Sequence, residues 1–336
     1  MDDIYPDFQP ISLDAKRVLQ GFVQRFPPYA DFNVWNLIGW DTQGRAAYSF
    51  LNGNLVIRAK DYFSDRYVYS LLGTSRIDDT LRELFRLTAS LELVPEIVVR
   101  NISDPRFFTV EEEPNNHDYI LSTEKLVNPC GNSLYSIRVE VFRFPRNYPG
   151  HTIRLLDFSN TQDRNDVIEM TRLWCAGKGF DERETQEEAE IIGRFMHYAP
   201  FFGNASLGLY LGAKMIGFAV NEMVSEDTAI AHFGKSDLNY EGSSRYIVHR
   251  TAKMLYQRGC LYLNYEEDAG IPGLRRAKLA YRPINILKKY KVRAGPADRP
   301  DMDSGYSSEQ PAGEAYRWAA TSQSQRVMST STNHST

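Results

Sequence analysis

The order of helix-forming and strand-forming segments repeats between the two halves of the chain, and this repeat limits the possible folds more than any other feature. In the second half, two helical segments precede a hairpin with its turn at Gly212-Ala213, and strands then alternate with helices up to PINILKKYKV. The first half shows a shorter version: a helical segment, a hairpin with its turn at Asn52-Gly53, a strand, a helix, and EIVVR (96–100) as a strand. Because self-similarity indicates one structural unit used twice, the sequence predicts two related α+β units.

The size and composition of the chain agree with two folded units. A length of 336 residues exceeds what one compact core usually holds. Hydrophobic residues make up 42% and charged residues 24%, which is typical of a soluble folded protein. The net charge of -4 excludes a general positive field for nucleic acid, so such binding has to be local.

Two kinds of site are not expected from the sequence. The three cysteines have no metal-ligand spacing, so we predict neither a bound metal nor another cofactor. No run approaches the roughly 20 apolar residues that span a bilayer, and the first residues do not resemble a secretory signal. We therefore expect a cytoplasmic protein without a transmembrane segment.

The second half has the element order of one known fold. Helix, helix, hairpin, strand, helix, strand, helix, strand is the order of an acetyltransferase-like (GNAT) unit. We predict an α+β fold with two tandem GNAT-like units, an N-terminal one over 1–120 and a C-terminal one with the active site over 151–293. The segment 117–150 is predicted to be a strand, a helix and a basic helix, with the helices over 121–150 as the bridge between the units, and the Ser/Thr-rich tail over 294–336 is predicted to be disordered.

Four motifs carry a resemblance to a known family: NVWNLIGWD, YSFLNGNLVIRAKDYFSD, IAHFGKSDLNYEG and LNYEEDAGIPGLRRAKLAYRPINILKKYKV. Over about residues 15–293 the chain resembles bacterial soluble proteins related to the C-terminal catalytic domain of phosphatidylglycerol lysyltransferases. The resemblance implies a tandem GNAT fold and transfer of an amino acid from aminoacyl-tRNA to an acceptor such as a lipid head group or a small molecule. The bridging helix departs from related sequences, because Arg138, Arg143 and Arg146 are present but the usual lysines are Ser and Asn.

Acidic residues close one strand of the second half. Asn264, Glu266 and Asp268 alternate along the segment LNYEED, so we expect them on one face of the strand. Sites in open sheets form where strands end and helices begin. We predict that Glu266 or Asp268 takes the proton of the nucleophile or binds the ammonium of the amino acid, with Asn264 binding substrate. The alternative is a set of surface ion pairs, each worth about 0 to 1 kcal/mol.

Basic residues follow on the next helix. Arg275, Lys278 and Arg282 lie three and four residues apart, which predicts one basic stripe beside an apolar stripe of Leu274, Ala277 and Tyr281. We expect the basic stripe to bind the phosphates of a tRNA end or of an acidic acceptor.

The segment IAHFGKSDLNYEG supplies a second group of candidates. His232 is a candidate base, or alternatively a core histidine, and alternation places it on one face with Gly234. Lys235 would assist in binding a phosphate. Tyr240 is a candidate to protonate a leaving group, or alternatively one of the twenty tyrosines with a structural role. Only Gly242 stands before the next helix, so the two-glycine cradle expected for coenzyme A is missing.

These residues predict one concave pocket that joins the carboxylates and cations of 262–282 to Lys235. The predicted function is aminoacyl transfer from aminoacyl-tRNA to a hydroxyl or amine. Two alternatives stay open: a CoA-dependent N-acyltransferase, and a non-catalytic protein that binds a phosphorylated ligand.

Overall fold

The computed structural model describes residues 3–60 and 66–295, which form two compact units. Residues 3–60, 66–117 and 287–295 make the first unit, and residues 118–286 make the second. This division differs from the expected one in two places, because 118–150 is part of the second unit and 287–293 is part of the first. Of the predicted disordered tail, 296–336 lies outside the described residues.

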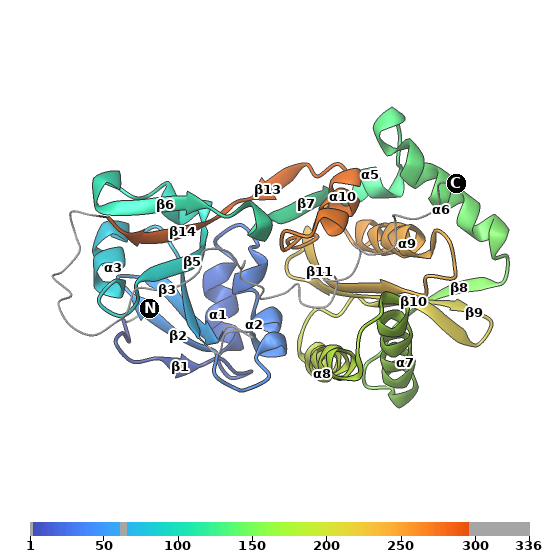
Figure 1. The fold of residues 1–336 in the computed structure, drawn as a ribbon, viewed down its shortest axis with the longest axis horizontal. Coiled ribbons are helices and arrows are strands. Elements are labelled where there is room, and N and C mark those ends of the chain that lie inside the picture. The colour runs from blue at the N-terminus through green and yellow to red at the C-terminus, as the bar shows by residue number, and fades with distance from the viewer. Residues whose placement is uncertain (1–2, 61–65, 296–336) are drawn as a thin grey trace, which may run out of the picture. The chain divides into compact units, whose positions relative to one another are not determined.

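The first unit contains two antiparallel sheets. One has the strand order β1-β2-β3-β4, and the other has β14 between β5 and β6 (Figure 1). The strands are β1 (Gln9–Pro10), β2 (Ala47–Leu51), β3 (Asn54–Lys60), β4 (Tyr67–Leu72), β5 (Ser90–Pro95), β6 (Phe108–Glu112) and β14 (Lys289–Ala294). The helices are α1 (Lys16–Val23), α2 (Val34–Trp40), α3 (Ile77–Leu84) and α4 (Glu96–Val99), with short 3-10 helices at Ala30–Phe32, Pro105–Phe107 and Pro114–Asn116.

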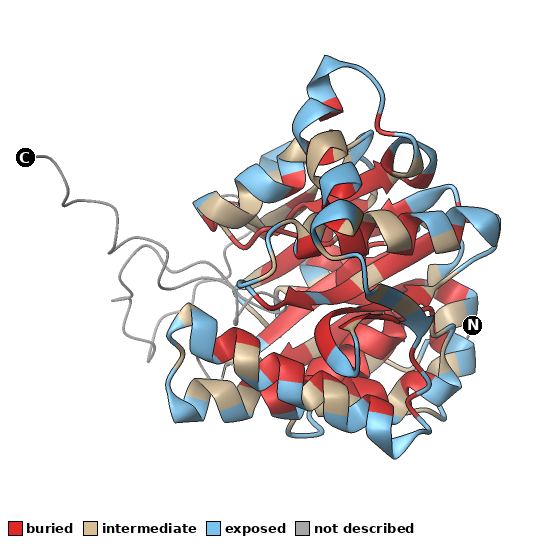
Figure 2. Ribbon diagram, turned by 90° about the vertical axis from the view of Figure 1, so that its right-hand side faces the viewer, coloured by how far each residue is buried: buried red, intermediate tan, exposed pale blue. Residues whose placement is uncertain are grey.

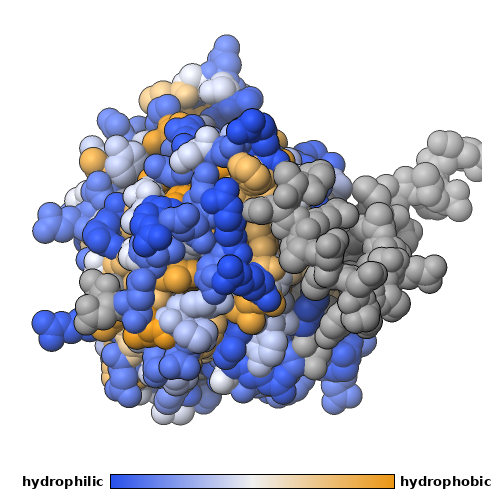
Figure 3. Space-filling model, turned by 90° about the vertical axis from the view of Figure 1, so that its left-hand side faces the viewer, coloured by the Kyte–Doolittle hydropathy of each residue, from blue (hydrophilic) through white to orange (hydrophobic). Residues whose placement is uncertain are grey.

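One expected strand of this unit is a helix. The hairpin at Asn52-Gly53 is confirmed, since both residues have the positive φ that a two-residue turn requires. The segment EIVVR is instead the helix α4. β5 ends at Pro95, because proline has no N–H to donate to a strand ladder. The extended backbone of Pro95 also suits the residue before a helix. In Figure 3, where this unit faces the viewer, hydrophilic side chains surround small hydrophobic patches.

The second unit is built on one sheet with the strand order β13-β7-β12-β11-β10-β9-β8. The strands are β7 (Asp118–Ser122), β8 (His151–Leu155), β9 (Leu207–Leu211), β10 (Lys214–Met223), β11 (Thr228–Ser236), β12 (Tyr262–Asn264) and β13 (Asn285–Leu287). The helices are α5 (Thr123–Val127), α6 (Tyr135–Asn147), α7 (Thr161–Lys178), α8 (Glu182–Tyr198), α9 (Ser243–Gln257) and α10 (Pro272–Ala280), with 3-10 helices at Asn132–Leu134 and Ala199–Phe201.

Helices cover both faces of this sheet. In Figure 1, α7 and α8 lie on one face and α9 on the other, and Figure 2 shows the strands buried between helices with exposed outer surfaces. The order α7, α8, β9, β10, β11, α9, β12, α10 is the predicted one, whereas β8 before it was not predicted and the last expected strand, PINILKKYKV, is divided between β13 and β14. None of the helices in the described ranges is both long enough and apolar enough to cross a membrane.

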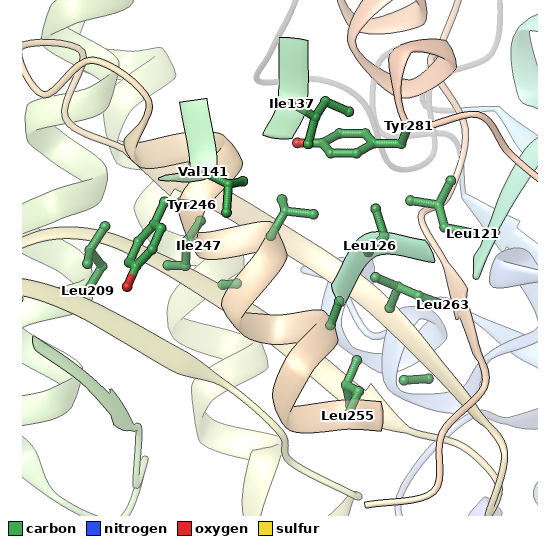
Figure 4. Packing of buried hydrophobic residues seen from close by; sticks show 14 of the residues in the cluster. Leu121, Leu126, Ile137, Val141, Leu209, Tyr246, Ile247, Leu255, Leu263 and Tyr281 are labelled. Carbon is green, nitrogen blue, oxygen red and sulfur yellow. The ribbon is translucent and has the colours of Figure 1, made fainter. Parts of the chain in front are cut away.

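The segment expected to bridge the units contributes to the core of the second one. Ile137, Val141 and Phe144 of α6 are buried against α9 and its neighbours, as the close-up in Figure 4 shows for Ile137 and Val141. The ring of Phe144 stacks on Tyr246 of α9 with 4.6 Å between the ring centroids. The helices α5 and α6 therefore belong to the unit that holds the candidate site.

Candidate active site

The strands β11 and β12 are paired for only three residues and then separate. Their parallel pairing runs from Thr228 opposite Tyr262 to Ile230 opposite Asn264. Beyond this point β11 continues along β10 as far as Ser236. Among the described residues, the second half of β11 is therefore paired with β10 alone.

The chain after β12 turns toward β7 instead. Tyr265 N donates to Tyr119 O at 2.8 Å, and Tyr119 N donates to Glu266 O at 3.2 Å. Glu266 and Ala269 both have left-handed backbone, with φ of 54° and 49°. Such backbone is unfavourable for residues with a side chain and is concentrated at functional sites. The expected alternation of side chains along 262–268 is therefore interrupted at Glu266.

A small pocket lies where the two strands separate. Its cavity volume is about 20 Å³, enough for about one water molecule. The strands β10, β11 and β12 and the helix α9 provide its lining: Ala219, Asn221, Ala231, Phe233, Gly234, Lys235, Ser244, Ile247, Val248, Thr251, Leu263 and Tyr265. Glu266, Asp268, Arg275 and Lys278 are outside this lining, so the described residues do not form the expected pocket that joins them to Lys235.

A β-bulge lies beside this pocket. In β10, Val220 pairs with Phe233 and Asn221 pairs with Ala231, so His232 is an extra residue in β11. A bulge redirects side chains, and the rings of His232 and Phe195 of α8 lie 5.3 Å apart between centroids. Gly234 lines the pocket beside α9. His232 and Gly234 therefore do not share the environment that simple alternation predicts.

His232 lies between two buried carboxylates. Its Nδ1 is 3.3 Å from Oε1 of Glu266, and its Nε2 is 3.4 Å from Oε2 of Glu222. All three side chains are buried. Burial by itself lowers the pKa of His232, but the interactions with Glu222 and Glu266 outweigh it and raise the pKa from 6.5 to about 9. The histidine is thus held as a cation near neutral pH, between the two buried carboxyl groups.

Asp268 is surrounded by donors. Arg275 donates to both of its oxygens, from Nε and from Nη2, each at 2.8 Å. Gly270 N donates to Oδ1 at 2.8 Å, and the hydroxyl of Tyr119 donates to Oδ2. The pKa of Tyr119 is raised to about 12 by burial and by this carboxylate. Asp268 therefore fixes the turn into α10, and its lone pairs are occupied.

Lys278 lies on the buried face of α10, in contrast to the expected open stripe. Its Nζ donates to the backbone oxygens of Tyr265 and Glu267, each at 2.5 Å. Burial lowers its pKa, which the nearby carboxylates, chiefly Glu267, oppose. The side chain supports the turn after β12 and is not placed to meet a phosphate in solution.

Lys235 lies among the helices on the α7–α8 side. Its Nζ is 2.6 Å from Oε1 of Glu188 in α8, and 3.7 Å from the ring centroid of Trp174 in α7. Both Lys235 and Glu188 are buried. Lys235 thus lines the pocket, whereas its ammonium group is paired with Glu188 on the α7–α8 side of the sheet.

The other predicted residues are more scattered. Asn264 is buried and holds the turn, because its Oδ1 accepts from Glu266 N at 2.7 Å and its Nδ2 donates to Asp118. The ring of Tyr240 lies edge-on to Tyr148 in the connection from β11 to α9. Arg282 is exposed beyond α10.

The structure therefore brings together Glu266 with His232, and Asp268 with Arg275. Sequence reasoning missed Glu222 and Tyr119, which complete these two groups, and Glu188, which pairs with Lys235. Glu222 had a detectable signal, because it is a charged residue within the apolar strand segment MIGFAVNEMV. Tyr119 had none, since its contact with Asp268 joins residues 149 positions apart. Within the described ranges, no group of three or more His, Cys, Asp or Glu residues could hold a metal ion.

Comparison with known proteins gives a consistent result. Residues 29–293 match the family model described as phosphatidylglycerol lysyltransferase, C-terminal. None of the curated proteins compared with the chain matches it.

Two solved structures share the fold. A conserved protein of unknown function from Bacteroides thetaiotaomicron has a TM-score of 0.75 and 21% identity, with coverage of 85% of this chain and 99% of that chain. The structure of L-PGS from Bacillus licheniformis has a TM-score of 0.57 and 13% identity, with coverage of 84% and 92%. The predicted α+β fold with two tandem GNAT-like units is thereby confirmed.

Proposed function

Since this chain belongs to the phosphatidylglycerol lysyltransferase C-terminal family, we propose that it moves an amino acid from an aminoacyl-tRNA to a hydroxyl or amine acceptor. In this reaction the acceptor oxygen or nitrogen attacks the ester carbonyl of the donor. The tetrahedral intermediate then releases the terminal ribose hydroxyl of the tRNA, which receives a proton. The donor is a cytoplasmic molecule, so the proposal places the reaction in the cytoplasm.

The observation that carries this proposal is the separation of β11 from β12 beside the Glu222–His232–Glu266 cluster. Beyond Ile230, β11 lacks pairing with β12, so backbone N–H groups of a fixed strand edge are suited to hold a developing oxyanion. Stabilisation of the oxyanion in this way requires correct positioning of the substrate and does not require a Ser-His-Asp triad.

We assign the proton transfer to Glu266. Its carboxylate contacts a histidine that stays protonated near neutral pH, so His232 is a positioning residue, not the base. A carboxylate of this kind takes the proton of the attacking group, which contributes about 10² to 10⁴ in rate. Asp268 holds Arg275, whose side chain keeps 37% of its surface exposed, and Arg275 is the cation suited to an anionic group of the substrate.

The test is to incubate the protein with labelled aminoacyl-tRNAs and cell extract, and to follow the label from the tRNA to its acceptor. Glu266→Gln is expected to lower the transfer rate at least about 100-fold. The control is Glu241→Gln, a substitution at a carboxylate whose side chain is 75% exposed. Full activity of Glu266→Gln with an intact fold would exclude this carboxylate, and absence of any transfer would count against the proposal.

The CoA-dependent alternative has less support. The connection from β11 to α9 has Asp237, whose Oδ1 accepts from Asn239 N at 3.0 Å and whose Oδ2 lies 2.9 Å from Nζ of Lys214. The backbone amide of Asn239, which a pyrophosphate would need, thus already donates to a carboxylate. Gly242, at the start of α9, is the single glycine of this connection. Tight binding of acetyl-CoA by the purified protein would reverse this preference.

One observation favours a second candidate, a non-catalytic binding protein. The pocket is only about 20 Å³, and Lys235, Lys278 and Asp268 are engaged within the protein. Binding of aminoacyl-tRNA without loss of its label in the presence of extract would support this candidate.

A further inference from the structure

We propose that the outer face of α6 docks this protein on an anionic lipid surface. The outer face consists of Tyr135, Arg138, Val139, Phe142, Arg143 and Arg146. With 3.6 residues per turn these six positions span about 140° of the helix surface. Three are apolar, three are arginines and none is acidic.

The opposite face of the same helix explains why these side chains point outward. Ile137, Val141 and Phe144 are buried in the core of the second unit, and this fixes the rotation of the helix. Tyr135 and Phe142 are then left 58% exposed each. They lie seven residues apart, about 10 Å along one side of the helix, and the half-buried Val139 lies between them.

Charge selects an anionic surface. Arg143 and Arg146 are exposed, and Arg138 lies over Tyr135 with 5.4 Å between its guanidinium and the ring centroid. The acids nearby lie beside the face: Glu140 pairs with Arg245 at 2.9 Å, and Glu241 lies 3.9 Å from Arg143. An apolar stripe flanked by cations is the pattern of a helix that lies in a membrane interface.

The same face suits other macromolecules less well. Single-stranded RNA stacks its bases on open aromatic faces, whereas one face of Tyr135 is covered by Arg138. A second copy of this chain would bring the arginines of two identical faces together across a two-fold axis, which is repulsive. A lipid surface accepts both the apolar stripe and the arginines. This inference goes beyond the proposed function, because docking needs no transfer reaction.

The test is flotation of the full chain with vesicles of phosphatidylcholine alone and of phosphatidylcholine mixed with phosphatidylserine. Binding is expected only with phosphatidylserine and is expected to fall as salt is added. Phe142→Gln should weaken partition about tenfold, as removal of a buried aromatic side chain predicts. Arg143→Gln combined with Arg146→Gln should weaken it roughly 25-fold, about fivefold for each charge.

The matched control is Phe201→Gln, which removes a phenylalanine that is 51% exposed in the same unit but outside α6. It should leave partition unchanged. The fluorescence emission of Phe142→Trp should shift to shorter wavelength when vesicles are added, and that of Phe201→Trp should not. Lack of binding to phosphatidylserine vesicles, or equal effects of Phe142→Gln and Phe201→Gln, would overturn the proposal. Binding of a single-stranded RNA oligonucleotide that Phe142→Gln abolishes, without vesicle binding, would assign the face to RNA instead.

Discussion

Raising the pH from 6 to 9.5 should destabilise the second unit through His232. Its pKa is raised from 6.5 to about 9 in the folded protein by Glu222 and Glu266 against the effect of burial. Between these values the folded state holds a proton that the unfolded state has lost. The stabilisation is therefore fully present below pH 6.5 and is lost as the pH rises through 9.

The two pKa values set the size of the effect. A change from 6.5 to about 9 corresponds to roughly 3 kcal/mol of the free energy of unfolding, since each pH unit is worth about 1.4 kcal/mol. The His232 side chain has no exposed surface, so solvent screening does not reduce this value. A loss of this size is a large fraction of the stability of a typical domain.

The assay is urea unfolding at pH 6, 7.5 and 9.5, followed by NMR signals of amides in β10 and β11. The control is the triple variant Glu222→Gln, His232→Gln, Glu266→Gln, which has no charge in the cluster. It retains His117 and His249, whose pKa values are lowered by burial and which act in the opposite direction. The wild type should lose about 3 kcal/mol more than this variant over the range.

Two results would refute the reasoning. One is a parallel pH dependence of unfolding in the wild type and the triple variant. The other is an imidazole NMR titration that places the pKa of His232 at or below its usual 6.5.

Two further substitutions test the ion pairs of Lys235 and Asp268. Lys235→Met should cost about 3 to 5 kcal/mol of unfolding free energy, because it leaves Glu188 buried without its cation. The double variant with Glu188→Met should recover most of this loss. Similar stability of both variants in urea would contradict the pairing. Asp268→Asn should cost about 1 to 3 kcal/mol and lower the transfer rate, because an amide cannot accept from Tyr119, Gly270 and Arg275 together as the carboxylate does; an unchanged melting temperature would show that the turn does not depend on this contact.

Local patterns predicted the elements of the fold where a short stretch determines the backbone. The turn at Gly212-Ala213 joins β9 to β10 as expected, because its glycine takes a positive φ. The helix over 243–257 follows from apolar residues at helical spacing, with Ile247, Thr251 and Leu255 all buried. These features depend on neighbours within a few positions.

The exchange of strands between the two halves could not be predicted in this way. β7 comes from the expected bridge and pairs with β12, and β14 follows the second half but pairs with β5 and β6 of the first unit. Pairing across such distances depends on which sheet edge is free, and no local pattern records that.

The burial of Lys278 shows why charge spacing alone misplaced the basic stripe. Helical spacing puts Ile271, Lys278 and Tyr281 on the face that is in fact buried. A lysine tolerates this position because its stem is apolar and its ammonium reaches the backbone oxygens of Tyr265 and Glu267. The residue between these two, Glu266, has left-handed backbone.

The turn after β12 separates the roles of two carboxylates that the sequence presents as equivalent. Asp268 receives donors from Tyr119, Gly270 and Arg275, so a proton on it would break several bonds at once, and it is poorly suited to proton transfer. Glu266 contacts a cationic His232 that also contacts Glu222, so a change of charge on Glu266 can be shared within the cluster. Of the two, Glu266 is therefore the carboxylate whose replacement by an amide should affect transfer more than folding, and Asp268 the one whose replacement should affect folding first.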